Sequence, residues 1–299
     1  VRAEPDPFHA REKTGAGRWK TGGRVVTLRR RDLLGSAAFG AALMGGVPGR
    51  LPAGEPVPSL DSLEAHVRMR CNLHGQRSYW FYTGTVFGNV VGESTRPMLG
   101  VEGVSFSVLE ELPGGRYRYS LTEAGYYLDV ETQAMQDEVV NPFTGASYRP
   151  KHYLSSQTNI FAPDLSVTPE LEFRPPGLEY RGVITPLRTF KNAAWSAEDL
   201  FVRIPNPRAA DDPDQPPHRV QTSLATLTAN LDQLLDPDLD FVDCQLNYQT
   251  LGTWRDWMGM GATPGMISWR MVGTKCSESD LPAYLVERIA ADHDGFFDG

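Results

Sequence analysis

The sequence predicts a mainly β protein with few helices, built as one antiparallel domain that is either barrel-like or a strongly bent sandwich. Short runs of aromatic and β-branched residues recur along the chain, and Gly, Pro and Asn turn signals separate them. Several of these runs alternate apolar and polar residues, as half-buried strands do. The length of residues 55–299 suits a single large β domain. We therefore expect one domain there, after an N-terminal segment of residues 1–54.

The predicted strands share this composition and end near turn signals. The glycine pair at 114–115 predicts a tight turn between the second and third of them. Asn141 and Pro142 predict a compact turn before the fourth, because Asn caps turns through its own side chain and Pro fixes the next φ. The predicted strands are 77–86, 98–109, 116–130, 147–156, 179–190, 200–204, 223–228, 241–250 and 265–273.

Helices are predicted at only a few places. Residues 279–293 have Ser279 as a candidate N-cap, Pro282 in the first turn and regularly spaced apolar residues. Residues 60–68 predict a short helix capped by Ser59 or Asp61. The segment 224–235 is compatible with a strand or a helix.

The N-terminal segment carries the pattern of an export signal. Arg30 and Arg31 directly precede an apolar run of 12 residues from Leu33 to Met44, rich in Ala and Gly. A membrane-spanning helix needs about 20 such residues, so the run is typical of a secretory signal, and the arginine pair resembles a twin-arginine signal. The expectation is recognition by the twin-arginine translocation machinery, cleavage near Gly54, and a periplasmic or secreted protein.

The charge of the chain limits the kinds of partner that the protein can bind. Residues 1–54 hold 10 of the 29 basic and 4 of the 37 acidic residues, which leaves 19 and 33, a net charge of −14, for residues 55–299. So acidic a domain is a poor partner for nucleic acid or an anionic membrane surface. No later segment approaches the length of a membrane span, so no stable span is expected.

Cofactor and metal motifs are missing from the sequence. It contains no Walker loop, dinucleotide glycine fingerprint, His-Glu-x-x-His motif or nucleophile elbow. The three cysteines have no metal-site spacing. Either Cys244 pairs with Cys276 after export, or all three, with Cys71, are small buried thiols. We expect neither a nucleotide cofactor nor a bound metal.

Aromatic residues are dense at two places and predict either a packed interior or a ligand pocket. In the run from Tyr79 to Tyr82, Trp80 and Tyr82 lie on the same face of the predicted strand, because side chains alternate along a strand. A second cluster combines tryptophans and methionines near the C-terminus. Its members are Trp254, Trp257, Met258, Met260, Met266 and Trp269. Walls of this kind suit a small apolar or aromatic molecule.

His152, Glu102 and Asn141 are the polar candidates for a site. His152 falls in a predicted strand after the Asn-Pro turn, and an imidazole transfers protons near neutral pH. Glu102 interrupts an apolar run, so its carboxylate is expected to be buried and to face the interior. We expect His152 as the proton-transfer group, Glu102 as its partner, and Tyr82 with Asn141 as hydrogen-bond donors. The alternative for His152 is a structural histidine.

The order of several motifs resembles the bacterial DUF1838 family. They are YWFYTGTVFG, MLGVEGVSF, YYLDVETQ followed by NPFTG and a histidine, AAWSAEDLFVRIPNP, and WRDWMGMGATPGMISWRMVGTK. The resemblance runs from about Ser59 to His293, and a twin-arginine leader is common among relatives. One departure is that Val139 and Val140 stand before the Asn-Pro turn, where a Trp or a polar residue is expected. The resemblance implies an architecture and a cellular route, and it assigns no reaction.

Together these features predict an exported protein that binds a small apolar or aromatic molecule and is a cofactor-independent acid–base enzyme: an isomerase, a lyase or a hydrolase. One alternative is a periplasmic binding protein without catalysis. The other is a structural protein of the cell envelope. Only the enzyme requires His152 and Glu102 to converge on one cavity.

Overall fold

The computed structural model describes residues 20–21, 24–25, 60–210, 212 and 215–298. Contacts divide the chain into two units, residues 1–56 and 57–299. In the first unit, β1 (Lys20–Thr21) pairs antiparallel with β2 (Arg24–Val25). Arg30 and Arg31, with the rest of the predicted export signal, lie outside the described residues. Across the described ranges, no helix combines the length and apolar character that crossing a membrane requires.

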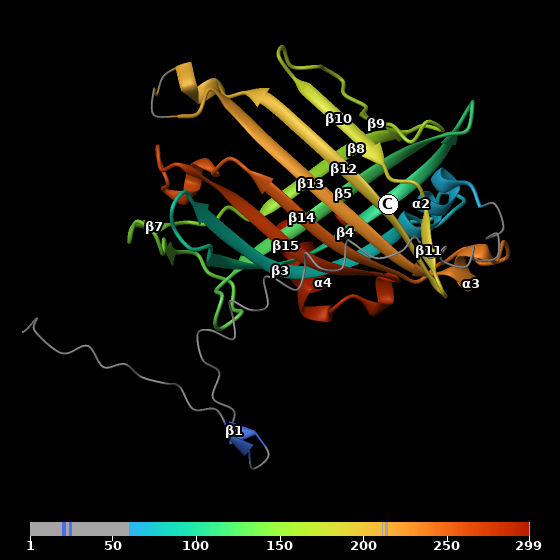
Figure 1. Cartoon of the computed structure of the whole chain (residues 1–299), viewed down its shortest axis with the longest axis horizontal. Helices are drawn as coiled ribbons and strands as arrows, with labels where there is room; N and C mark the ends of the chain where they lie inside the picture. Colours follow the sequence, from blue (N-terminus) through green and yellow to red (C-terminus); the bar gives the residue numbers. More distant parts are fainter. Residues whose placement is uncertain (1–19, 22–23, 26–59, 211, 213–214, 299) are drawn as a thin grey trace, which may run out of the picture. The chain divides into compact units, whose positions relative to one another are not determined.

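The second unit is a nearly closed antiparallel barrel, in agreement with the predicted fold class (Figure 1). Ten strands follow one another around it in the order β10-β12-β13-β14-β15-β3-β4-β5-β8-β9. They are β3 (Ser78–Val90), β4 (Arg96–Leu112), β5 (Arg116–Leu128), β8 (Tyr153–Phe161), β9 (Val167–Pro169), β10 (Glu179–Ile184), β12 (Ala193–Pro205), β13 (His218–Asn230), β14 (Cys244–Gly252) and β15 (Gly265–Cys276).

The barrel closes differently at its two joins. The first long strand, β3, pairs with the last, β15, over twelve residue pairs from Tyr79–Cys276 to Val90–Gly265. At the other join β9 and β10 meet through a single bridge, Ser166–Val183, and a hydrogen bond from the Ile184 N–H to the Leu165 carbonyl. A closed or nearly closed barrel leaves few unpaired strand edges.

Each predicted strand overlaps an observed one, and β3, β4, β12, β13 and β15 are longer than predicted. The predicted strand 147–156 is wrong in its extent: the chain forms β7 (Ser147–Tyr148), which pairs with β6 (Val139–Val140), and β8 begins only at Tyr153. The predicted strand 179–190 divides into β10 and β11 (Arg188–Phe190) at Pro186, because a proline cannot donate a ladder hydrogen bond. His152 therefore lies just before a strand.

One short helix closes an end of the barrel. Helix α2 (Ser62–Arg70) begins after Asp61, whose carboxylate accepts hydrogen bonds from the N–H groups of Leu63 and Glu64. This confirms one of the two predicted caps. The helix is buried on almost every side, and its apolar residues pack against side chains of the inner barrel wall such as Tyr119 and Trp80. It therefore acts as a plug inside the sheet.

A second helix covers the outer surface of β3, β4 and β5. Helix α4 (Ala283–Asp292) packs Leu285 and Ile289 onto outward side chains including Val104 and Tyr126. It begins after Pro282, so the predicted N-cap at Ser279 is wrong; Ser279 lies in the preceding 3₁₀ turn Glu278–Asp280. Because α4 covers them, these strands are buried on both faces.

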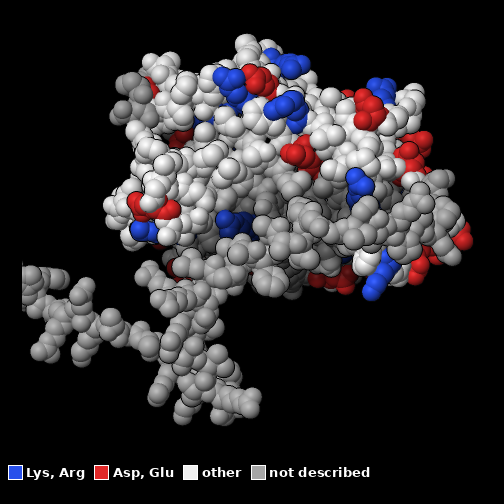
Figure 2. Space-filling view, in the orientation of Figure 1, with Lys and Arg blue, Asp and Glu red and all other residues white. Residues whose placement is uncertain are grey.

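The remaining elements are short. The ambiguous segment 224–235 contains both alternatives, since β13 ends at Asn230 and α3 (Leu231–Leu235) follows, capped by the Asn230 side chain. Two 3₁₀ turns span Pro207–Ala210 and Asp256–Met258. Cys71, Cys244 and Cys276 are all free thiols, the first two buried. Figure 2 shows acidic and basic side chains interspersed over the described part of one face.

Candidate functional site

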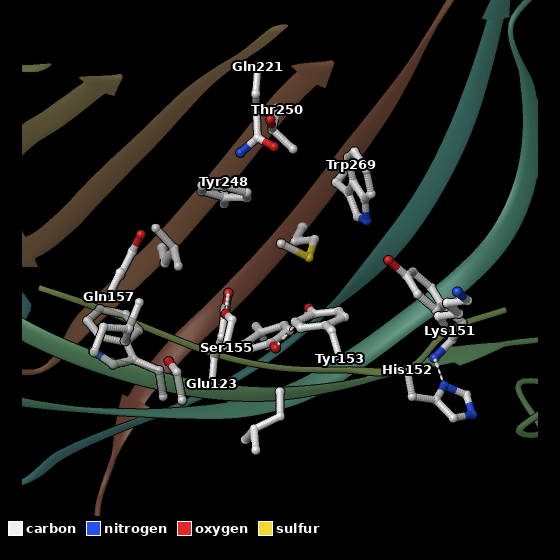
Figure 3. A pocket seen from close by; sticks show the side chains of 18 of the residues that line it. Glu123, Lys151, His152, Tyr153, Ser155, Gln157, Gln221, Tyr248, Thr250 and Trp269 are labelled. Atoms are coloured by element: carbon white, nitrogen blue, oxygen red, sulfur yellow. Dashed lines mark hydrogen bonds between the residues drawn. The ribbon is translucent and has the colours of Figure 1, made fainter. Parts of the chain in front are cut away.

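The barrel encloses a cavity of about 620 Å³ whose walls come from nine elements or their flanks. Inward positions alternate along each strand, as in Tyr119, Leu121 and Glu123 of β5. Figure 3 shows Tyr248, Thr250 and Trp269 on one wall, facing Glu123, Tyr153 and Ser155 on the other. The lining residues used below are Arg70, Trp80, Tyr82, Tyr119, Glu123, Lys151, His152, Tyr153, Ser155, Tyr248, Arg255, Trp257, Trp269 and Met271.

Two tyrosines lie toward each other across two paired glycines. In the strand register, Tyr82 of β3 faces Gly103 of β4, Gly103 faces Gly125 of β5, and Gly125 faces Tyr153 of β8. A methyl group at Gly103 would overlap the Tyr82 hydroxyl, and one at Gly125 would overlap the Tyr153 ring. The glycines therefore provide the space that the two phenol rings occupy.

The hydroxyl groups of these tyrosines form a hydrogen-bonded pair. The Tyr82 and Tyr153 oxygens are 2.9 Å apart, and the Tyr82 hydroxyl also lies 3.3 Å from the Ala124 carbonyl, to which it donates. Burial is the main reason why the pKa of each tyrosine is well above its ordinary value. Both phenols therefore stay protonated at neutral pH, and the pair is a source of O–H donors.

Glu123 is the carboxylate of the cavity. Its Oε1 accepts a hydrogen bond from the Ser155 hydroxyl at 2.8 Å. The group is half-buried and borders the cavity, and removal from water raises its pKa above the ordinary value of 4.5. Its negative charge in turn raises the pKa of Tyr82, Tyr153 and Tyr248, so the carboxylate acts electrostatically on all three phenols.

Charged residues also occupy the closed end, where α2 meets β12. The Glu198 carboxylate is 2% exposed and lies 3.8 Å from both the Arg70 guanidinium and the His66 ring. Burial alone would raise the pKa of Glu198, but the Arg70 charge and the His66 ring hold it below its ordinary value. The His66 Nδ1 is 2.8 Å from the Ser196 hydroxyl, and burial lowers the pKa of the ring. Arg70 alone of these four residues lines the cavity.

His152 lies at the cavity wall and holds the end of a strand. Its Nδ1 accepts a hydrogen bond from the Tyr127 backbone N–H at 3.0 Å, just past the last ladder pair between β5 and β8. Because a backbone N–H only donates, Nδ1 is unprotonated and the neutral ring carries its proton on Nε2. Burial and the nearby Arg288 charge lower the pKa of His152. The proposed proton-transfer role of His152 stays a prediction.

The cavity brings together five of the residues that the sequence singled out. Trp80 and Tyr82 lie on the inner face of β3, as the alternation predicts, and Trp257 and Trp269 join them with His152. The Trp80 indole N–H donates to the Arg70 carbonyl at 3.1 Å, which connects this wall to the plug helix. Whether any of these side chains binds a ligand stays a prediction.

Glu102 lies outside this group, and its expected pairing with His152 does not form. It is absent from the cavity wall and accepts a hydrogen bond from the hydroxyl of Tyr284, a residue of α4, at 2.9 Å. The physical reason is that β4 is buried on both faces, with Val101 facing inward and Val104 facing α4. Apolar neighbours therefore do not indicate which face of the strand points into the barrel.

Asn141 and Trp254 also lie away from the cavity. The Asn141 oxygen accepts hydrogen bonds from the N–H groups of Phe143 and Thr144, which confirms the predicted compact turn. Its amide nitrogen donates to the Met258 carbonyl at 2.8 Å, so every polar atom of this side chain serves the fold. The Trp254 indole N–H donates to the Thr263 carbonyl, and its ring lines a smaller, separate pocket.

Sequence reasoning missed Glu123, Tyr153 and Arg70. Glu123 lies in the alternating run of the predicted strand 116–130, and the alternation alone does not distinguish it from a surface residue. A usable signal was Gly125, two residues after Glu123, because a glycine within a strand often marks the close approach of another group. Nothing local identifies Arg70, whose position depends on the docking of α2. In the described part of the chain, no cluster of three or more His, Cys, Asp or Glu residues is arranged to hold a metal.

The fold and the site define a class: a meandering antiparallel barrel, plugged by one helix, with a tyrosine-rich cavity that contains one carboxylate. Residues 75–297 match the family described as protein of unknown function (DUF1838), and the chain belongs to that family. A search of curated proteins found no match.

Proposed function

We propose that the protein binds a small, flat, largely apolar carbonyl compound inside the barrel and transfers a proton on it, with Glu123 as the acid–base group. The observation that carries this proposal is the arrangement of one half-buried carboxylate and a tyrosine hydroxyl pair on the same aromatic cavity. Pockets of this kind combine apolar walls with a few convergent polar groups. Carboxyls with raised pKa values in clefts are typical acid–base groups.

The chemistry of the proposal is proton transfer at a carbon next to a carbonyl group. Glu123 takes the proton from that carbon, the electron pair of the C–H bond forms an enolate, and the enolate oxygen accepts a hydrogen bond from the tyrosine pair. In a ligand whose enolate is conjugated with a C=C bond, return of the proton to the far carbon of that bond shifts the double bond, completes an isomerisation and restores Glu123. When the Tyr82 O–H donates to the Ala124 carbonyl, Tyr153 donates to Tyr82; when the Tyr82 O–H turns to the Tyr153 oxygen, the Tyr153 O–H is free to donate to the ligand.

Blocking the cavity tests whether the ligand binds inside the barrel. Met271 lines the cavity, whereas its neighbour Val272 points outward and is 56% exposed. We expect Met271→Trp to weaken binding of the naphthyl ketone 2-acetylnaphthalene by at least about tenfold, or ~1.4 kcal/mol, in calorimetric titration. Val272→Trp, the same substitution on the other face, should bind like the unaltered protein. Equal binding by both variants would place the ligand outside the barrel.

We also propose that Arg30 and Arg31 direct export through the twin-arginine route to the periplasm. The support is the sequence pattern of an arginine pair before a short apolar run. Changing both residues to lysine keeps the charge but removes the planar guanidinium groups. We expect the processed protein to disappear from the periplasmic fraction and the precursor to accumulate in the cytoplasm. Unchanged processing would mean that this pair is not read by that machinery.

A further inference from the structure

Arg70 is a mostly buried cation that borders the cavity and has one hydrogen-bond donor without a partner in the described part of the chain. It is the last residue of α2, and its side chain is 11% exposed where it lines the cavity. Its buried Nε has no hydrogen-bond partner among the described residues. Its nearest carboxylate, Glu198, lies 3.8 Å from Nη2, which is longer than a hydrogen bond.

Arg68, on the same helix, also has a buried Nε without a hydrogen-bond partner among the described residues, but both of its Nη groups are bonded. Its guanidinium donates to the backbone carbonyls of Leu234, Asp236 and Leu239. Those contacts join α2 to the segment around α3, so Arg68 serves the fold. Arg70 points instead toward the cavity, and its guanidinium lies over the Tyr119 ring with the Cζ atom 5.1 Å from the ring centroid.

The cavity as a whole is more positive than the domain around it. Arg70 lines its closed end, and the exposed Lys151 and Arg255 contribute to its wall, whereas Glu123 is the one carboxylate among the described lining residues. Residues 55–299 carry a net charge of −14. Cations gathered in a hollow of an acidic domain attract a ligand of negative charge, and the apolar walls strengthen that field.

We propose that the ligand is an aromatic carboxylate whose acid group pairs with Arg70 at the closed end of the barrel. The guanidinium fork matches a carboxylate with two parallel hydrogen bonds, and the Arg70 side chain lines the cavity. Along β5, Glu123 lies four positions after Tyr119, the residue beneath the guanidinium, which is roughly 14 Å of strand at ~3.4 Å per residue. A two-ring acid with a carbonyl at its far end spans this interval. This inference rests on the proposed function and specifies its substrate class.

The test compares an acid with its neutral analogue. Binding of 6-acetyl-2-naphthoate and of the corresponding primary amide is measured by calorimetry on the full chain. We expect the unaltered protein to prefer the acid by at least about tenfold, or ~1.4 kcal/mol. Arg70→Met should remove the preference. The matched control is Arg270→Met, because Arg270 is exposed and its guanidinium lies over Phe87 rather than in the cavity.

A second variant provides the same test if Arg70→Met alone does not fold. Arg70→Met with Glu198→Gln removes the buried cation and the charge of its carboxylate together, so no uncompensated charge remains between them. Loss of the preference in this folded double variant supports the proposal, and retention of the preference overturns it. If the unaltered protein binds the acid and the amide equally, and Met271→Trp blocks both, then the pairing of a ligand carboxylate with Arg70 is overturned while the proposed function stands. Failure of both compounds to bind overturns the proposed function as well.

Discussion

Replacing Glu123 by glutamine is expected to slow proton transfer by ~10²–10⁴-fold, the usual contribution of a general acid–base group. Glutamine keeps the size of the side chain and its contact with Ser155, but its amide is not a base at neutral pH. The measurement is exchange of the acetyl protons of 6-acetyl-2-naphthoate for deuterium in D₂O, followed by proton NMR. The affinity for this compound should change by no more than a few-fold, because binding rests on the walls and on Arg70.

The pH dependence of this exchange follows from the pKa of Glu123. The carboxylate is the base, and burial raises its pKa above 4.5. The rate is therefore expected to be highest above that raised pKa and to fall as the pH drops through it. In the Glu123→Gln variant the exchange rate should no longer fall at low pH in this way, because only the slow background reaction remains.

Two other variants distinguish the proposed proton-transfer role of Glu123 from the roles that the sequence analysis gave to Glu102 and His152. Glu102→Gln, on the outer face of β4, should leave the exchange rate unchanged. His152→Asn retains an acceptor at the position of Nδ1 for the Tyr127 N–H, so the fold should persist. Loss of exchange in His152→Asn with full exchange in Glu123→Gln would make the histidine the proton-transfer group and contradict our assignment.

Removing the carboxylate of Glu198 is expected to lower the free energy of unfolding by ~3–5 kcal/mol, the cost of breaking a buried ion pair from one side. In Glu198→Ala the Arg70 guanidinium keeps its charge in the closed end of the barrel and loses its nearest counter-charge. Urea denaturation measures the effect. The double variant Arg70→Met with Glu198→Leu should regain much of the loss, since no buried charge then remains unpaired.

An exposed ion pair provides the control for this prediction. Glu179 and Arg203 are joined at 2.7 Å on the barrel surface, and both side chains are substantially exposed. Glu179→Ala should cost no more than ~1 kcal/mol, because water screens surface pairs. If Glu198→Ala also lowered the free energy of unfolding by no more than ~1 kcal/mol, water or a polar ligand group would already be stabilising the Arg70 charge.

The strands of the domain could be predicted from local residues. Which side chains point into the cavity depended on how the strands pair and on what covers their outer faces. Trp80 and Tyr82 are two positions apart, so the strand period places them on the same face, and both line the inner wall. For Glu102 and Glu123 the period is the same, but α4 covers the outer face of β4 and β5 with apolar side chains. The sequence around each carboxylate then contains apolar residues on both faces, and the inner face cannot be read from it.

Interactions between distant segments account for the other differences. Asn141 satisfies its own turn, as predicted, but its amide also binds the Met258 carbonyl 117 residues away, which removes it from the site. Arg70 reaches the cavity only because α2 enters the barrel end. The Tyr82–Tyr153 pair depends on Gly103 and Gly125 facing each other, which is a property of the β4–β5 register. Each of these arrangements requires the tertiary fold.

The central claim, that Glu123 and the tyrosine pair act on a ligand inside the barrel, is tested most directly by a crystal structure of the protein with 6-acetyl-2-naphthoate. The account predicts the compound within the cavity, with its carbonyl oxygen ~2.6–3.2 Å from a hydroxyl of Tyr82 or Tyr153 and its acetyl methyl carbon facing the Glu123 carboxylate. The compound bound outside the barrel, or inside it with the acetyl group turned away from Glu123 and both hydroxyls, would contradict the claim.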